Sequence, residues 1–270
     1  MIGPRPIAQA TREEWRPLQF VLTDIDDTLS TDGRLTSDVY AMLEQLNIAG
    51  IHVIPITGRP AGWCDMIARF WPVSAVVGEN GAFYFRYDHH ARRMTRVFHD
   101  DDETRARHNG KLRAVRDQVL ACVPGAAVAA DQTYRATDLA IDFAEDVARL
   151  PGSRIDQIVQ VFADAGAVAK VSSIHVNGWF GDYDKLTMSR RLLMDEFRIG
   201  IDQSEGQRIC AFIGDSPNDA VMFEALSKSV GVANLADASD RITSLPNWIT
   251  KRRSGAGFCE FAACVLATRT

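Results

Sequence analysis

The sequence predicts an α/β protein, in which a Rossmann-like parallel-sheet core carries an inserted α+β cap domain. Two observations lead to this fold class. Short apolar runs alternate with segments whose apolar residues recur at helical spacing, at residues 20–23, 52–57, 75–77 and 209–213. This order is typical of a parallel sheet with right-handed crossovers. Between residues 83 and 176, apolar and polar residues alternate instead, as in antiparallel strands.

Composition argues against several classes of protein. The chain has 270 residues, of which 46% are hydrophobic and 24% charged, as in ordinary soluble globular proteins. The formal net charge of −5 does not favour nucleic acids or acidic membranes, so we expect neither as a partner. No apolar run reaches the roughly 18 residues of a membrane span, and the first twenty residues lack the apolar centre of a signal peptide.

The five cysteines are scattered and form no C-x-x-C pair. Neither a zinc site nor a disulfide framework is therefore predicted. We expect free thiols in a reducing cytoplasm, and hence a cytoplasmic protein. The cysteines are Cys64, Cys122, Cys210, Cys259 and Cys264.

The first half of the core is predicted as follows. A helix begins after Thr36, a favourable N-cap, and ends at Gly50. The strand at residues 52–57 contains Pro55, which removes a hydrogen-bond donor, so we expect distortion or an unpaired side there. A second helix begins at Pro60. The buried faces of the two helices are predicted to be Val39, Met42, Leu43 and Leu46, and Trp63, Met66, Ile67 and Phe70.

The inserted unit is predicted to begin with a hairpin at residues 83–98. A helix at 100–122, a strand at 139–143, a helix at 155–166 and one strand at 168–176 follow. The acidic run at its first helix suits the positive end of the helix dipole better than a metal site.

The parallel pattern then resumes after the inserted unit. A helix at residues 184–197 precedes the strand at 209–213, and a helix through Met222, a strand at 230–233 and a terminal helix at 255–266 follow. We therefore expect a catalytic core and an inserted cap. The core takes residues 18–85 and 183–270, and the cap takes residues 86–182.

The first strand ends abruptly in three carboxylates and a threonine, Asp24, Asp26, Asp27 and Thr28. Asp24 and Asp26 lie two residues apart and so point to the same side, whereas Asp27 points away. Two like charges so close need a divalent cation or a shared proton. By itself, the string fits an acidic turn equally well.

Other element ends carry matching groups, namely Thr57, Lys185, Asp215 and Asp219. The carboxyl edge of a parallel sheet is where ligands bind, so these groups can meet there. Phosphoryl transfer through an aspartyl-phosphate needs such a set. A carboxylate attacks phosphorus, a hydroxyl and an amine hold the phosphate oxygens, and a second carboxylic acid protonates the leaving group.

These residues resemble the haloacid dehalogenase (HAD) superfamily, specifically its phosphatases with a large α+β cap between the second and third motifs. The similarity covers residues 20–266. The matching motifs are DIDDT at Asp24–Thr28, TGR at Thr57–Arg59, Lys185 and GDSPND at Gly214–Asp219, with ENGA at Glu79–Ala82 and GVAN at Gly231–Asn234.

The resemblance implies a role for each acidic residue. Asp24 is the nucleophile and a Mg²⁺ ligand. Asp26 is the acid/base and contributes its backbone carbonyl to the metal. Asp215 ligates Mg²⁺ directly, and Asp219 supports the site through water or by orienting Lys185.

Substrate binding is implied for a second set of residues. Thr57 and Lys185 hold the phosphoryl oxygens, and we expect Gly58, Arg59 and Asn80 to contact the substrate as well. Four cap-side candidates are His175, Asn177, Trp179 and Asp182.

The predicted function is a magnesium-dependent phosphatase for a small phosphorylated substrate, which we expect to be a sugar phosphate or a phosphorylated glycoside. A phosphomutase with the same nucleophile remains an alternative. A phospho-aspartate switch module like a response-regulator receiver is another. The roughly hundred-residue insertion after Thr57 and the acid at Asp26 oppose the switch. Which sugar is bound, and whether the chain forms oligomers, stay open.

Overall fold

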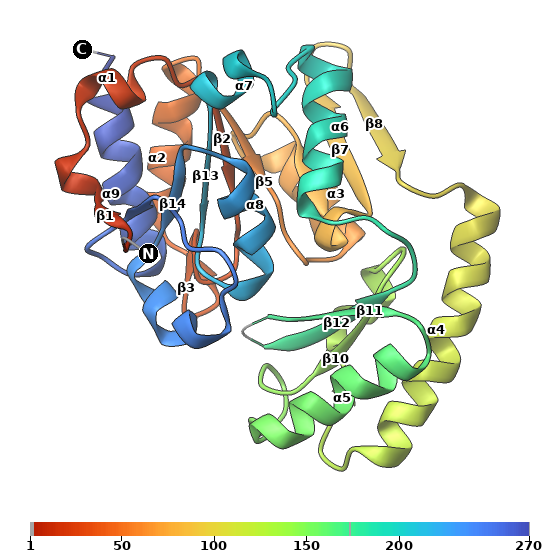
Figure 1. Ribbon diagram of the computed structural model, residues 1–270. Coiled ribbons are helices and arrows are strands. Elements are labelled where there is room, and N and C mark those ends of the chain that lie inside the picture. Colours follow the sequence, from red (N-terminus) through yellow and green to blue (C-terminus); the bar gives the residue numbers. More distant parts are fainter. Residues whose placement is uncertain (1–2, 173, 270) are drawn as a thin grey trace.

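The computed structural model describes residues 3–172 and 174–269, without the side chains of residues 238–241. Two units are visible, a larger core around a parallel sheet and a smaller cap below it (Figure 1). No helix in the described ranges is long and apolar enough to cross a membrane. All five cysteines are free, as predicted.

The core sheet has six strands in the order β1-β15-β14-β13-β2-β5, and every neighbouring pair is parallel. The predicted fold class is therefore confirmed. The strands β1, β15 and the hairpin strands β3 and β4 are too short to stand out in the sequence. The bounds are β1 (Arg5–Pro6), β2 (Phe20–Thr23), β3 (Ser30–Thr31), β4 (Arg34–Leu35), β5 (His52–Pro55), β13 (Cys210–Gly214), β14 (Ser229–Gly231) and β15 (Trp248–Ile249).

Helices cover both faces of this sheet, which is why its strands are almost entirely apolar. Alternate side chains of β2 enter different clusters, Val21 on one face and Phe20 and Leu22 on the other. The first face packs against α1 (Arg12–Trp15), α2 (Ser37–Ile48), α3 (Ala61–Phe70) and α9 (Ser254–Leu266), and the second against α6 (Lys185–Phe197), α7 (Ser204–Ile209) and α8 (Ala220–Ala225).

Pro55 lies in β5, the edge strand of the six-stranded sheet. The next residue, Ile56, donates its N–H to the carbonyl of Thr23 in β2 (2.7 Å). Successive residues of a strand point to opposite sides, so the nitrogen of Pro55 faces away from β2. The missing donor thus falls on the outer side of the strand, as predicted.

The predicted buried face of α3 is wrong for three of its four residues. Trp63, Met66 and Phe70 are 39%, 42% and 73% exposed, and only Ile67 is buried. Cys64 and Ala68 take the inner positions beside Ile67. The small side chains of Cys64 and Ala68 let the helix approach the sheet closely. The prediction favoured the bulky residues for the buried face because it rested on size and hydrophobicity alone.

The hairpin β7 (Phe83–Asp88) and β8 (Arg93–Phe98) belongs with the core, although we placed most of it in the cap. It pairs antiparallel with β6 (Val76–Gly78), and Phe83 and Phe85 enter the first core cluster. The aromatic residues at alternate positions predict a pair of antiparallel strands. They do not indicate whether this hairpin packs on the core or on the cap. The exact division of the chain into domains stays a prediction.

The cap consists of a four-stranded antiparallel sheet with α4 and α5 packed on it. The predicted single strand at 168–176 is wrong, because the structure has two strands that pair with each other from Val171 and Val176 outward. The hydroxyl of Ser172 accepts the N–H of His175 (3.0 Å) and helps close the turn. The bounds are α4 (Asp102–Cys122), β9 (Ala127–Val128), β10 (Leu139–Asp142), α5 (Gly152–Asp164), β11 (Val168–Val171) and β12 (His175–Trp179).

The acidic run lies at the start of α4, where it suits the helix dipole, and its residue Asp101 is also the N-cap. The carboxylate of Asp101 accepts the N–H of Thr104 (2.7 Å). This satisfies one of the free donors at the helix start.

One core carboxylate fastens the cap. Glu79 is fully buried. Its Oε1 accepts the N–H groups of Ala61 (2.9 Å) and Ala136 (2.8 Å), and its Oε2 accepts those of Thr137 (2.7 Å) and Asp138 (3.2 Å). Three of these donors belong to the cap segment before β10, so this single side chain joins the two units.

Glu79→Gln should destabilise the protein, because an amide NH₂ would face backbone donors and leave at least one of them unsatisfied. An unsatisfied buried donor costs about 1–3 kcal/mol, so we expect the thermal unfolding midpoint to fall by at least about 2 °C. Glu44→Gln, at an exposed site on α2, is the matched control. Equal midpoints for the two variants would contradict the role of Glu79.

Candidate active site at the carboxyl edge of the core sheet

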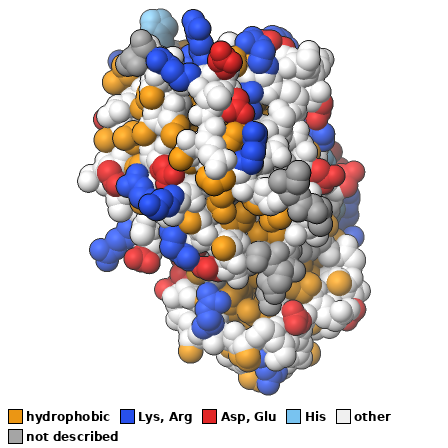
Figure 2. Space-filling view, turned by 60° about the vertical axis from the view of Figure 1, so that its left-hand side comes forward, with side chains coloured by type: hydrophobic (Ala, Val, Ile, Leu, Met, Phe, Trp, Pro, Cys, Tyr) orange, Lys and Arg blue, Asp and Glu red, His pale blue; other side chains and the backbone are white. Residues whose placement is uncertain are grey.

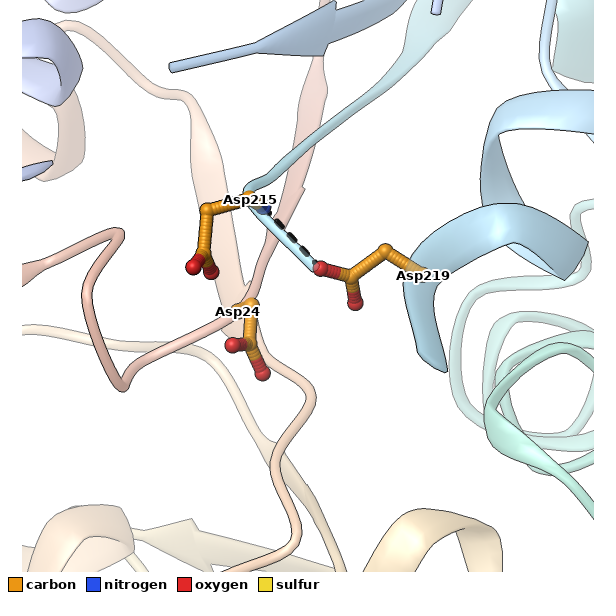
Figure 3. A group of neighbouring side chains, drawn as sticks. All are labelled: Asp24, Asp215 and Asp219. Carbon is orange, nitrogen blue, oxygen red and sulfur yellow. Dashed lines mark hydrogen bonds between the residues drawn. The ribbon is translucent and has the colours of Figure 1, made fainter. Parts of the chain in front are cut away.

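Three buried carboxylates gather where β2 and β13 end (Figure 3). Asp24 follows β2, Asp215 follows β13, and Asp219 lies in the short 3₁₀ turn after β13. One oxygen of each lies within 4.8 Å of the others. The two strands are parallel neighbours, which is why residues far apart in sequence meet at this edge.

Both oxygens of the Asp219 carboxylate accept hydrogen bonds from protein groups. Its Oδ2 accepts the N–H groups of Asp215 (3.0 Å) and Ser216 (3.1 Å), and its Oδ1 accepts a bond from Lys185 (2.7 Å). A Cβ at Gly214 would lie 2.5 Å from Asp219 Oδ2, so this position needs glycine. The contacts favour an orienting role for Asp219 over direct metal ligation.

Lys185 is the first residue of α6 and is 2% exposed. Its Nζ donates to Asp24 Oδ1 (2.8 Å) as well as to Asp219. Burial alone would lower the pKa of this ammonium, but the two carboxylates more than offset it and hold the pKa above its ordinary value. Lys185 is therefore a permanent cation.

The start of α6 is fixed by the turn that carries the ENGA string. Gly81 has φ +111°, and a Cβ there would lie 2.0 Å from the carbonyl oxygen of Asp184. Asp184 itself caps α6 by accepting the N–H of Thr187 (2.7 Å). Only glycine permits this close approach, which brings Lys185 to the sheet edge.

The carboxylates carry more negative charge than Lys185 can balance. Burial raises the pKa of Asp24 to about 7, with Lys185 opposing and Asp219 and Asp26 adding to the rise. Burial and the neighbouring Asp24 and Asp219 likewise raise the pKa of Asp215 well above its ordinary value. A bound divalent cation would relieve this repulsion.

The donor set fits Mg²⁺, which prefers hard oxygen ligands. Asp24 and Asp215 would supply carboxylate oxygens, and the backbone carbonyl of Asp26 lies two residues further along the same loop. The side chain of Asp215 is held in place, because it accepts bonds from the Thr28 hydroxyl (2.8 Å) and from Asn234 Nδ2 (3.3 Å). Asn234 comes from the GVAN string.

Thr57 and the TGR turn lie beside this cluster. The N–H of Thr57 donates to Val77 (2.9 Å), and its carbonyl accepts the N–H of Asn80 (3.0 Å). Asn80 packs behind Gly58, whose Cα carries no side chain to block it. Gly58 lines a small cavity beside Asp24, whereas Thr57 and Asn80 do not. Asn80 thus supports the turn from behind.

Arg59 links the acid/base candidate to the cap. Its Nε donates to both oxygens of Asp26 (3.0 Å each) and its Nη2 to Oδ1 (2.8 Å). Its Nη1 reaches Glu145 (3.2 Å) and lies 3.8 Å from Asp131, both in the cap. Neither of these two cap acids lies in a recognisable motif, so nothing in their local sequence marks them as site residues.

Two of the four cap-side candidates reach the site. His175 Nε2 lies 2.9 Å from Glu145, and Asn177 Nδ2 donates to Asp138 (3.1 Å). The close approach of His175, together with the charge of Arg59, lowers the pKa of Glu145 to about 2 despite partial burial.

The other two candidates lie elsewhere. Trp179 is buried in the core, stacked on Tyr183 with ring centroids 5.6 Å apart. The side chain of Asp182 is 99% exposed, 3.7 Å from His99. Trp179 is the last residue of β12, and its side chain packs into the core, whereas Asp182 lies beyond the end of the strand.

Core and cap residues together enclose a cavity of about 20 Å³ above Asp24. Arg135, which sequence reasoning missed, lines it from the cap and donates to the carbonyl of Gly58 (2.9 Å). Such a volume holds about one water molecule. A larger substrate therefore has to extend beyond this cavity.

No known family profile matches the sequence, and no curated protein is similar to it. Solved structures do match. The C-terminal domain of trehalose-6-phosphate phosphatase from C. albicans is 12% identical, with a TM-score of 0.72 and 98% of each chain covered. The sucrose-phosphatase from Synechocystis sp. PCC6803, solved with sucrose and phosphate, is 14% identical, with a TM-score of 0.62 over 93% of this chain and 98% of that chain.

A haloacid dehalogenase-like hydrolase from Bacteroides thetaiotaomicron is also similar, at 12% identity and a TM-score of 0.59, with 91% of this chain and 98% of that chain covered. At these identities the similarity shows the fold. The chain has the fold of haloacid dehalogenase-type phosphatases with a cap, as its motifs implied.

Magnesium should stabilise the protein more at pH 8 than at pH 6. With a pKa raised to about 7, Asp24 is largely protonated at pH 6 and ionised at pH 8, and a carboxylate must lose its proton to bind metal. The measurement is the rise in thermal unfolding midpoint on adding magnesium. Asp215→Asn should abolish the rise, and the exposed control Asp117→Asn should keep it. Equal rises at both pH values would contradict this assignment.

Proposed function

We propose that the protein is a phosphatase that hydrolyses a phosphomonoester through an aspartyl-phosphate on Asp24. The observation that carries this is the ammonium of Lys185, 2.8 Å from Asp24 Oδ1 at the edge of the sheet. It holds one oxygen of the nucleophile and leaves the other free to attack. Asp26 follows two residues later as a second carboxylate that Lys185 does not contact.

Mg²⁺ held by Asp24, Asp215 and the carbonyl of Asp26 would neutralise charge on the phosphate oxygens. Side chains of the protein make the other contacts with the phosphoryl group. Lys185 and the Thr57 hydroxyl bind the oxygens of the transferred group, where negative charge is concentrated. Asp219 keeps Lys185 in place.

Asp26 is the general acid and the general base. It gives one to the leaving oxygen and later takes one from the water that attacks the aspartyl-phosphate. Arg59 donates to both of its oxygens, which fixes the orientation of the carboxylate. Glu145 and Asp131 of the cap share the same guanidinium, so cap position and Asp26 are linked.

The proposed substrate is a sugar phosphate or a phosphorylated glycoside. Arg135, His175 and Asn177 present polar groups to the cavity from the cap, a set suited to hydroxyl groups. The similar structures named above include a sucrose-phosphatase and a trehalose-6-phosphate phosphatase, which supports the same class. The free cysteines are consistent with a cytoplasmic location.

Asp24→Asn should abolish turnover, because the amide has no nucleophilic oxygen of comparable strength. We expect the rate with p-nitrophenyl phosphate and magnesium to fall by at least about a thousandfold. Asp117→Asn, at an exposed position of α4, should keep full activity. Near-normal turnover in the Asp24 variant would refute the mechanism. A phosphorylated protein without turnover would instead point to a switch module.

Arg59→Lys should lower kcat more than it raises KM. Lysine keeps the charge but cannot grip both oxygens of Asp26 and reach Glu145 at once. A decrease of at least about tenfold in kcat is expected. Arg69→Lys is the matched control, because Arg69 pairs with Asp65 on the outer side of α3. If the two lysine variants are equally active, Arg59 does not position Asp26.

A further inference from the structure

One arginine of the cap binds the turn of the core that carries the TGR motif. The two units meet along a hollow between the larger upper unit and the smaller lower one (Figure 2). Between them, Arg135 Nη1 donates to the carbonyl of Gly58 (2.9 Å), although the two residues lie 77 positions apart in the chain. The side chain of Arg135 is only 1% exposed. It is therefore an interior contact between cap and core and not a surface charge.

Two carboxylates of the cap hold Arg135 in place. Its Nε and Nη2 donate to the two oxygens of Asp131 (3.1 and 3.2 Å), and its Nη1 donates to both oxygens of Asp138 (3.0 Å each). All three guanidinium nitrogens are thus engaged, and the carboxylate of Asp131 alone balances the single charge. Arg135 is therefore poorly suited to neutralise a phosphate, but it is rigid enough to fix the group it contacts in the core.

All three carbonyls of the TGR turn accept a hydrogen bond from the protein. In a trans peptide the N–H points away from the carbonyl, so fixing a carbonyl also fixes the N–H of the next residue. Backbone groups of the core hold the first and the third carbonyl, and the cap holds the middle one. The bonds are Asn80 N–H to Thr57 (3.0 Å), Arg135 Nη1 to Gly58 (2.9 Å) and Glu79 N–H to Arg59 (3.2 Å).

The middle peptide, between Gly58 and Arg59, orients the hydroxyl of Thr57. The N–H of this peptide donates to Thr57 Oγ1 (3.0 Å). A hydroxyl that accepts this bond must point its own hydrogen elsewhere, and the hydrogen bonds of the described residues include none that it donates. The hydroxyl can therefore donate to a phosphoryl oxygen. Its direction depends on a peptide whose other end is bound by Arg135.

We propose that Arg135 is a positioning residue for phosphoryl transfer: by holding the carbonyl of Gly58, it fixes the peptide that orients the hydroxyl of Thr57. This rests on the proposed phosphatase function and assigns part of its site to the cap. The phosphoryl-binding turn of the core is complete only when the cap occupies the position seen in the structure. Arg135 acts through the turn and does not need to touch the phosphoryl group.

The test is a double-mutant cycle on the hydrolysis of p-nitrophenyl phosphate with magnesium. Arg135→Lys keeps the charge, but one ammonium cannot replace the three nitrogens that bind Asp131, Asp138 and Gly58. We expect kcat to fall by at least about tenfold, with a smaller change in KM. Thr57→Val has no hydroxyl to orient, so adding Arg135→Lys to it should cost less than about twofold more. The nitrophenyl group has no sugar hydroxyls, so any role of Arg135 in binding them does not enter.

Equal losses in the two backgrounds, or no loss in either, would overturn the proposal. Asp138→Asn is a second variant, because it weakens the hold on Arg135 and leaves that side chain in place. It should lower kcat and show the same dependence on Thr57. Arg116→Lys is the matched control in the cap. In the described residues Arg116 donates only to Asp117, so this variant should keep full activity. Thermal unfolding confirms that each variant is folded.

Calorimetry with inorganic phosphate and magnesium repeats the cycle without turnover. Arg135→Lys should weaken phosphate binding in the wild-type background and leave it unchanged in Thr57→Val. If this coupling is found in a protein that hydrolyses nothing, the role of Arg135 holds and the proposed function fails. Turnover with independent losses at the two positions would uphold the function and refute the role of Arg135. If phosphate does not bind and no substrate turns over, both are wrong.

Discussion

The site depends on one buried ammonium group. Lys185 lies between Asp24 and Asp219, 2.8 Å and 2.7 Å from their nearest oxygens. Burying an unpaired charge costs several kcal/mol, so three carboxylates could not share this interior without a cation among them. Gly81 has no side chain because the start of α6 must come this close. The acidic edge of the sheet and the path of the chain are therefore parts of one electrostatic arrangement.

Much of the core could be predicted from sequence, because strands covered on both faces are continuous apolar runs and each ends in polar residues. The failures have physical causes. On α3, small residues rather than large ones face the sheet, so Cys64 and Ala68 lie inside while Phe70 is exposed. The hairpin that starts at Phe83 has the same alternating pattern whether it packs on the core or on the cap, so its location could not be derived.

The same contrast holds for the site. Asp24, Lys185 and Asp215 lie at element ends within recognisable motifs, and the structure brings them together. Glu145 and Arg135 meet the site only because the cap folds over it, and nothing in their local sequence marks them. Residues that act through tertiary contact between two units have no short-range pattern, whereas residues fixed by strand ends do.

The attachment of the cap through Glu79 sets the kind of motion available to it. The carboxylate holds the segment before β10, and both chain connections also leave the cap on this side (Figure 1). Arg135 and Glu145 of the cap bind the carbonyl of Gly58 and the guanidinium of Arg59 beside the cavity, so any displacement of the cap has to break these two contacts as well. Of the three carboxylates near Arg59 in the described residues, only Asp26 belongs to the core and would stay beside it.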